Sequence, residues 1–162
     1  MRAFVRCERG AAAGEMALLL PLLILMVFGA VEMGYYFYNQ HQVVKGVRDG
    51  ARFAARQSFV DINCTAGYTL PSATETAIKE VTRTGQPSGG TTRVFGWVNS
   101  NVTVAVNCPT TALRTGIYRD EPNAPVVTVS ARVNFPSLFH GLGFLTNSYE
   151  LYATQQAAVM GI

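Results

Sequence analysis

A long apolar stretch near the N-terminus predicts a helix that crosses a membrane. No charged side chain occurs from Met16 to Val31, and the run ends in aromatic residues at 35–38. As a helix, residues 11–38 would be about 42 Å long, which exceeds the ~30 Å hydrocarbon core of a bilayer. Aromatic side chains at its end match the belt found at membrane–water interfaces. We therefore expect a transmembrane helix over residues 11–38.

Beyond residue 38 the apolar residues recur at helical spacing. This stripe consists of Val43, Val47, Ala51, Ala54, Ala55 and Phe59. It predicts an amphipathic extension of the same helix over residues 39–57. Pro21 lies inside the long helix and is expected to kink it near residues 17–21. Gly46 and Gly50 each lower helix propensity by ~1 kcal/mol, but we expect their small size to let a sheet pack closely.

Charged residues of the extension suggest two kinds of contact. Lys45 and Asp49 are four residues apart, a spacing at which they can pair on a helix. A basic stripe at the same spacing consists of Arg48, Arg52 and Arg56. The stripe is either a solvated face or a contact for acidic lipid headgroups or a partner subunit.

Residues 58–162 show the pattern of a small head domain, which starts with a loop over residues 58–72. A short helix is expected over residues 73–84. Its signals are a capping box, three inward apolar positions and a terminating glycine, namely Ser72 with Glu75, then Ala77, Ile78 and Val81, then Gly85. Such a glycine commonly ends a helix because it adopts the left-handed conformation without strain.

Alternating apolar and polar residues predict strands in the rest of the head. The predicted strands cover residues 92–98, 102–107, 126–135 and 148–159. Residues 109–125 form a long polar loop, which is unusual in a compact domain and suggests an interaction surface. Pro136 ends the preceding strand, and residues 137–144 are expected to form a turn or short helix.

Together these elements predict an α+β protein. A long N-terminal transmembrane helix continues into a small head with one short helix and a three- to four-stranded antiparallel sheet. The stripe over residues 43–59 is expected to lie on the apolar face of that sheet. The chain is thus divided into a basic leader (1–10), the transmembrane helix (11–38), its extension (39–57) and an extracytoplasmic head (58–162).

Composition narrows the function further. The chain has 162 residues, so about 105–120 remain outside the membrane, enough for one small domain with its own core. A net charge of +3 without a basic run argues against a nucleic-acid partner. Basic residues flank the apolar run almost equally, which leaves the positive-inside rule undecided. We place the N-terminus in the cytoplasm because the leader is too short to be a domain.

Two of the three cysteines predict a disulfide in the head. Cys7 lies in the leader, which leaves Cys64 and Cys108 as an even pair. The chain has no CxxC motif and only two histidines, so no metal site is expected. In an oxidising compartment a disulfide is the natural interpretation, and a loop of this length contributes roughly 4 kcal/mol. The alternative is two unrelated buried thiols.

The sequence contains no motif for catalysis. HExxH, the P-loop, GxSxG and a GxGxxG after a strand are all missing from it. Ser137 and His140 are near each other, but nothing in the sequence orients the histidine. We therefore expect no enzyme, no cofactor and no small-molecule substrate.

Small residues precede the apolar run instead of following it. A secretory signal has its cleavage site after the apolar region, whereas residues 10–14 lie before it. A cut after Gly10 would remove the charged leader, retain the helix and make Ala11 the new N-terminus. Glu15 stands at the front edge of the run, where an ionised carboxylate costs roughly 2–3 kcal/mol or more at depth in lipid. Such a residue usually has a partner or a function.

This arrangement resembles the class III signal of type IV pilin-like proteins and, within them, the TadE-like family of tight-adherence (Tad) pilus systems. Family members typically read RxGAAAVEFALVLP, then a leucine-rich run, FGxxExG and a helix ending in a GARxAA-like segment. The matching segments are Arg9–Leu18, Leu20–Leu22, Phe28–Gly29, Glu32–Gly34 and Gly50–Arg56. Gly14 stands where the family usually has Val, and Met16 where it has an aromatic residue. The resemblance covers residues 9–56, about a third of the chain.

The resemblance implies a prepilin peptidase that cuts on the cytoplasmic face between Gly10 and Ala11. It also implies that Glu15 neutralises the N-terminal amine of a neighbouring subunit, the alternative being a carboxylate at headgroup level. Glu32, ~26 Å further along the helix, is expected to be an interfacial carboxylate. The implied partners are inner-membrane lipid, other pilin-like subunits and the pilus assembly platform. The implied location is the bacterial inner membrane, which the chain crosses once, with a periplasmic or extracellular head. If the subunit joins a fibre, it is also part of a surface pilus.

The function expected from these features is that of a minor pilin or pseudopilin of a Tad-type pilus assembly or secretion system. Its role would be structural, in fibre assembly and surface adhesion. The alternative is a signal-anchored periplasmic binding domain that never joins a fibre.

Overall fold

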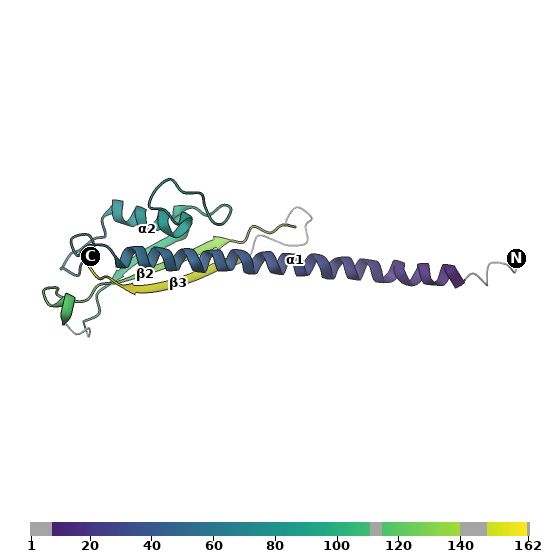
Figure 1. The fold of residues 1–162 in the computed structure, drawn as a ribbon, viewed down its shortest axis with the longest axis horizontal. Coiled ribbons are helices and arrows are strands. Elements are labelled where there is room, and N and C mark those ends of the chain that lie inside the picture. The colour runs from purple at the N-terminus through teal and green to yellow at the C-terminus, as the bar shows by residue number, and fades with distance from the viewer. Residues whose placement is uncertain (1–7, 111–114, 140–148, 162) are drawn as a thin grey trace.

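A computed structural model describes residues 8–110, 115–139 and 149–161. Its elements in chain order are α1 (Glu8–Ala55), α2 (Ser72–Thr84), the short 3-10 helix η2 (Asn99–Asn101), β1 (Val102–Asn107), the short 3-10 helix η3 (Gly116–Tyr118), β2 (Val126–Asn134) and β3 (Glu150–Ala158). Figure 1 shows the head gathered around the C-terminal half of α1, while the N-terminal half projects away from it as a rod. The predicted α+β class, with its pilin-like layout, is confirmed.

Helix α1 is one continuous helix of 48 residues, and it passes through Pro21 without interruption. It begins at Glu8, so the last residues of the predicted leader belong to it, and it ends two residues before the predicted end at 57. At that end the backbone N–H of Gln57 donates to the carbonyl of Ala54 at 3.1 Å. The Gln57 side chain also donates to the carbonyl of Phe53 at 3.1 Å. These bonds tighten and cap the last turn.

The sheet has the order β1-β2-β3, and both pairs are antiparallel. Val129 in the central strand lies opposite Val104 of β1 and Gln155 of β3. The inward positions of β2 are buried against the buried stripe of α1, as predicted, and these residues are Val43, Val47, Ala51, Ala54, Val127, Val129, Ala131 and Val133. The opposite face carries polar side chains, including a hydrogen-bonded Ser130–Thr154 pair at 3.0 Å.

The predicted strand over residues 92–98 is wrong, because this segment forms bends and turns. Val94 and Trp97 are both buried although they are three residues apart, a spacing that period-two alternation does not produce. Gly96 has φ +75°, which turns the chain between them. The part of the chain that the structure describes therefore holds a three-stranded sheet.

Helix α2 begins at Ser72, one residue before the predicted start, and its N-cap is Pro71. The predicted capping box is therefore wrong, since Ser72 already lies inside the helix and no side chain caps its end. Glu75 instead pairs with Lys79 at 2.7 Å. The predicted stop is confirmed, because Gly85 has φ +85° and its N–H donates to the carbonyl of Val81 at 2.8 Å.

Gly46 and Gly50 serve a close contact, but with α2 and not with the sheet as predicted. A methyl group at Gly46 would meet the carbonyl oxygen of Thr82 and would lie 2.8 Å from the ring of Trp97. At Gly50 it would meet the Thr82 hydroxyl, which donates to the carbonyl of Ile78 at 2.8 Å. The helix backbones can approach closely only because both α1 positions lack a side chain.

The predicted pair of Lys45 with Asp49 is replaced by a contact over a longer sequence distance. Asp49 accepts from Arg93 at 2.6 Å. Arg93 lies in the turns that follow α2, and its backbone N–H donates to the carbonyl of Arg83 at 3.0 Å. The ion pair thus connects these turns to α1.

The glycine contact predicts a clear stability effect. In the full-length protein in detergent, Gly46→Ala should lower the free energy of unfolding by about 1–3 kcal/mol, as overpacking usually does. The control is Gly34→Ala on the same helix, since a methyl group there meets nothing within 4 Å. That variant should be neutral or more stable by up to ~1 kcal/mol. Denaturant unfolding measures both, and equal stability of the two variants would contradict the close contact.

Candidate functional site

The N-terminal half of α1 is uncovered by the rest of the chain. Every side chain from Ala12 to Val31 is exposed, including large apolar ones such as Leu18 and Leu25. At ~1.5 Å per residue this stretch is about 30 Å long, the thickness of a bilayer core. Among the described residues, α1 is the helix long and apolar enough to cross a membrane. It is consistent with a single-pass membrane anchor.

Glu15 is placed near the start of this rod. Its side chain is exposed, and within the described residues it forms no salt bridge. Gly10 and Ala11 belong to the first turns of α1, but their surroundings lie outside the described part of the structure. Ala11 and Glu15 are four residues apart on a continuous helix, so they lie one turn from each other.

Glu32 lies where the rod meets the head and is only 8% exposed. Its Oε2 accepts a hydrogen bond at 3.3 Å from the backbone N–H of Leu138, which follows β2. Its Oε1 is buried without a hydrogen-bond partner among the described residues. The sequence suggested an interfacial carboxylate, and the structure adds that this carboxylate is covered by the head. No local signal could have revealed a contact between residues 106 positions apart.

Aromatic side chains form the rest of this junction. Tyr35 and Tyr36 pack on Phe135, with ring centroids 5.8 and 5.2 Å apart. Closer to the N-terminus of α1, Phe139 packs on Phe28, with ring centroids 5.0 Å apart. Half of the predicted aromatic belt is therefore used to hold the head, whereas Phe37 remains exposed.

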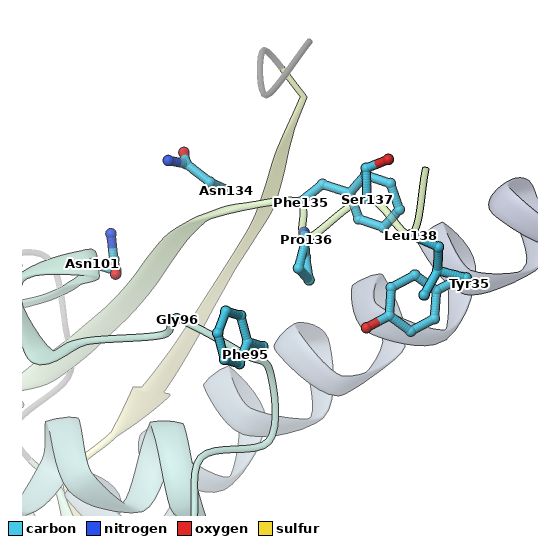
Figure 2. Close-up of a pocket in the computed structure, with 9 residues that line it drawn as sticks. All are labelled: Tyr35, Phe95, Gly96, Asn101, Asn134, Phe135, Pro136, Ser137 and Leu138. Atoms are coloured by element: carbon cyan, nitrogen blue, oxygen red, sulfur yellow. The ribbon is translucent and has the colours of Figure 1, made fainter. Parts of the chain in front are cut away.

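An open cavity of about 590 Å³ lies beside the junction. Figure 2 shows Phe95 and Tyr35 facing this cavity from two different segments of the chain. Pro136 lies between Phe95 and Phe135. Two amides, Asn101 and Asn134, line its other side. None of the nine lining residues is charged, so this cavity suits apolar or neutral groups.

The family model described as TadE-like protein matches residues 10–52. This segment is similar to the TadE-like family. The match associates the protein with the Tad pilus. No curated protein and no solved structure matches the chain.

The TadE-like segment coincides with most of α1, including Glu15 and Glu32. It stops three residues before the helix ends, so the head, apart from the α1 residues in its core, lies outside the match. The junction is thus made of a TadE-like helix on one side and residues 135–139, which the family model does not cover, on the other.

The predicted basic stripe lies exposed beyond the junction. Arg48 and Arg52 line a shallow hollow of about 200 Å³ together with Gln155 and Gln156 of β3. Arg56 is exposed as well. None of the three arginines pairs with an acid among the described residues. They therefore present free positive charge next to an edge strand of the sheet.

The polar cluster around Glu80 has a structural role in the head. Asn99 donates to Glu80 at 2.9 Å, and Arg83 pairs with the same carboxylate at 3.0 Å. The bond from Asn99, with help from Arg83, holds the pKa of Glu80 below its ordinary value, although desolvation acts in the opposite direction. Arg83 also donates to the carbonyl of Trp97 at 2.8 Å. The cluster connects α2 to the turns that precede β1.

The structure describes no arrangement of groups for metal chemistry. Within residues 8–110, 115–139 and 149–161, no three His, Cys, Asp or Glu side chains are placed to hold an ion. His140, which the sequence analysis considered beside Ser137, lies outside the described residues, as does most of the predicted turn or short helix over residues 137–144.

Cys64 and Cys108, the predicted pair, are joined by a disulfide with Cα atoms 5.7 Å apart. It connects the loop after α1 to the residue that follows β1. The bridge spans 44 residues in sequence.

This bridge predicts a measurable thiol count. In protein purified from membranes without reductant, Cys64 and Cys108 should resist alkylation, and both should react after reduction. Cys64→Ser with Cys108→Ser should lower the free energy of unfolding by roughly 4 kcal/mol, as the loop-entropy model gives for such a span. Intact mass spectrometry counts the adducts. Alkylation of both residues before reduction would show that the protein lacks the bridge.

Proposed function

We propose that this protein is a minor pilin or pseudopilin of a Tad-type pilus, with a structural role in fibre assembly and surface adhesion. The observation that carries the proposal is the division of α1. Its exposed N-terminal half lies within the TadE-like match, while its C-terminal half is the core of a folded head. The exposed half needs a surrounding other than water, because it presents a continuous apolar surface.

Two surroundings satisfy that need in turn. Before assembly the rod lies in the inner membrane, with the head on the periplasmic side. In the fibre the same surface packs against rods of other subunits. Gly14, Gly29 and Gly34 support such packing, since each has open space around it within this chain. Small residues let helix backbones approach closely in lipid, where van der Waals packing drives association.

Glu15 gives this assembly a direction. The prepilin peptidase cuts after Gly10, so that the α-amino group of Ala11 becomes a cation one turn from Glu15. An ionised carboxylate and an ionised amine are each costly in lipid, and pairing them between neighbouring subunits offsets both costs. The pairing fixes the register of one rod against the next. The work of the protein is then structural, with no catalytic step.

Processing is tested on the membrane-purified protein. N-terminal sequencing should read Ala11-Ala12-Ala13-Gly14-Glu15, and Cys7 should be missing from the mature chain. Gly10→Val should block the cut and leave the leader attached, because the small residue at the cut is lost. An unprocessed wild-type chain beginning at Met1 would instead favour a signal-anchored periplasmic domain that does not enter a fibre.

The assembly role of Glu15 is tested by counting fibres. Removing one partner of a buried ion pair costs about 3–5 kcal/mol, and each ~1.4 kcal/mol is tenfold in an equilibrium. Glu15→Ala should therefore reduce surface fibres tenfold or more while the protein remains processed and in the membrane.

The matched control is Glu75→Ala, which also removes one acid but breaks only an ion pair at the surface of α2. Electron microscopy of shed and cell-attached fibres gives the counts. If Glu15→Ala leaves the same number of fibres as Glu75→Ala, Glu15 has no part in assembly.

A further inference from the structure

The segment after β2 continues along α1 toward the exposed rod. Figure 1 shows this chain running beside α1 beyond the end of the sheet. Its last described residue, Phe139, packs on Phe28 of the rod with ring centroids 5.0 Å apart. Phe28 lies four residues before Glu32, or ~6 Å further from the head along the helix axis. The head therefore reaches past the charged end of the rod into its uncharged run.

Phe139 must share the surroundings of the helix residue it contacts. Phe28 remains 47% exposed although Phe139 covers it, and the neighbouring Leu138 is 52% exposed. No described residue covers the outer side of Leu138. If the rod lies in lipid, as the proposed function requires, then Leu138 and Phe139 lie against lipid as well.

The backbone N–H groups of this segment are suited to a place out of water. A donor without a partner is costly in lipid, so a segment that enters the bilayer must satisfy its N–H groups internally. The N–H groups of Phe135 and Ser137 donate to the carbonyls of Tyr149 and Phe135, at 2.8 and 3.0 Å. Pro136 has no N–H group.

Leu138 and Phe139 form the tip of this segment, and side chains accept hydrogen bonds from their two backbone N–H groups. The N–H of Leu138 donates to Glu32 at 3.3 Å, and that of Phe139 to the Ser137 hydroxyl at 3.3 Å. Every backbone donor from Phe135 to Phe139 thus has a partner in the protein, which an ordinary surface turn does not need.

We propose that Leu138 and Phe139 form a second membrane contact, in which the head inserts these two side chains into the headgroup–acyl boundary beside α1. The partner is the lipid bilayer itself, and the inference rests on the proposed membrane insertion of α1. Glu32 is a positioning residue, since it holds the Leu138 backbone against the helix without touching lipid. A contact at two places fixes the tilt of the head relative to the membrane.

The test measures lipid proximity at three labelled sites in the full-length chain, with Cys7→Ser to remove the free thiol. An environment-sensitive fluorophore is attached to Leu138→Cys, to Leu25→Cys within the rod, or to Val60→Cys, which is 87% exposed beyond the far end of α1. The protein is reconstituted in phosphatidylethanolamine–phosphatidylglycerol vesicles with and without spin-labelled lipid.

We expect quenching at residue 138 to be several-fold stronger than at residue 60. It should indicate a shallower depth in the bilayer than the label at residue 25. Quenching at 138 as weak as at 60, with strong quenching at 25, would overturn the second contact and leave the anchor intact. Weak quenching at 25 as well would overturn the membrane insertion of α1 itself. The two failures are thereby distinguished.

The role of Glu32 is tested by adding Glu32→Ala to the Leu138→Cys variant and to the Leu25→Cys variant. Glu32→Ala should lower quenching at 138 several-fold while a label at 25 is unaffected, because only the tip is released. Glu32→Gln retains a carbonyl acceptor and should restore the quenching. Unchanged quenching in Glu32→Ala would show that Glu32 does not position the tip.

Discussion

The packing of residues 43–55 of α1 into the head determines where everything else in the molecule lies. The sheet covers one side of this segment and α2 the other, and Gly46 and Gly50 bring α2 close enough to touch the helix backbone. Because α1 is continuous, fixing its C-terminal half also fixes the direction of the exposed half. A flexible linker at residue 39 would have left the rod and the head independent. With a single helix, any force on the head is transmitted to the rod.

Local patterns in the sequence were enough for most of the fold. The stripe at Val43, Val47 and Ala51 and the alternation in β2 are short-range periodicities, and both predicted the buried faces correctly. Gly85 was predicted to end α2 because the left-handed conformation is a property of the residue itself. The exposed apolar rod could likewise be predicted, since no compact head of this size could cover it.

The predictions that were wrong involve partners far apart in sequence or competing local signals. Residues 92–98 contain β-formers, but the segment forms bends and turns, and its Trp97 is buried against Gly46, which is distant in sequence. Asp49 had a suitable neighbour in Lys45, yet Arg93 is the partner that the fold brings near. The contact of Leu138 with Glu32 had no sequence signal at all. Of the candidate site, Glu15 was placed on the rod as expected, and its proposed partner belongs to another molecule.

The two acids at the ends of the uncharged run differ in how their charge is satisfied. Glu32 accepts a hydrogen bond from its own chain and is covered by the head. Glu15 is exposed and has no such bond among the described residues. A carboxylate in or near lipid needs a donor or a cation. The described part of the chain supplies a donor for Glu32 and shows none for Glu15. Under the proposed pairing with a neighbouring amine, Glu15 would be the acid that joins subunits, and because it lies at one end of the rod the association would be directional. Two subunits joined in this way would be offset along the fibre, not side by side in register.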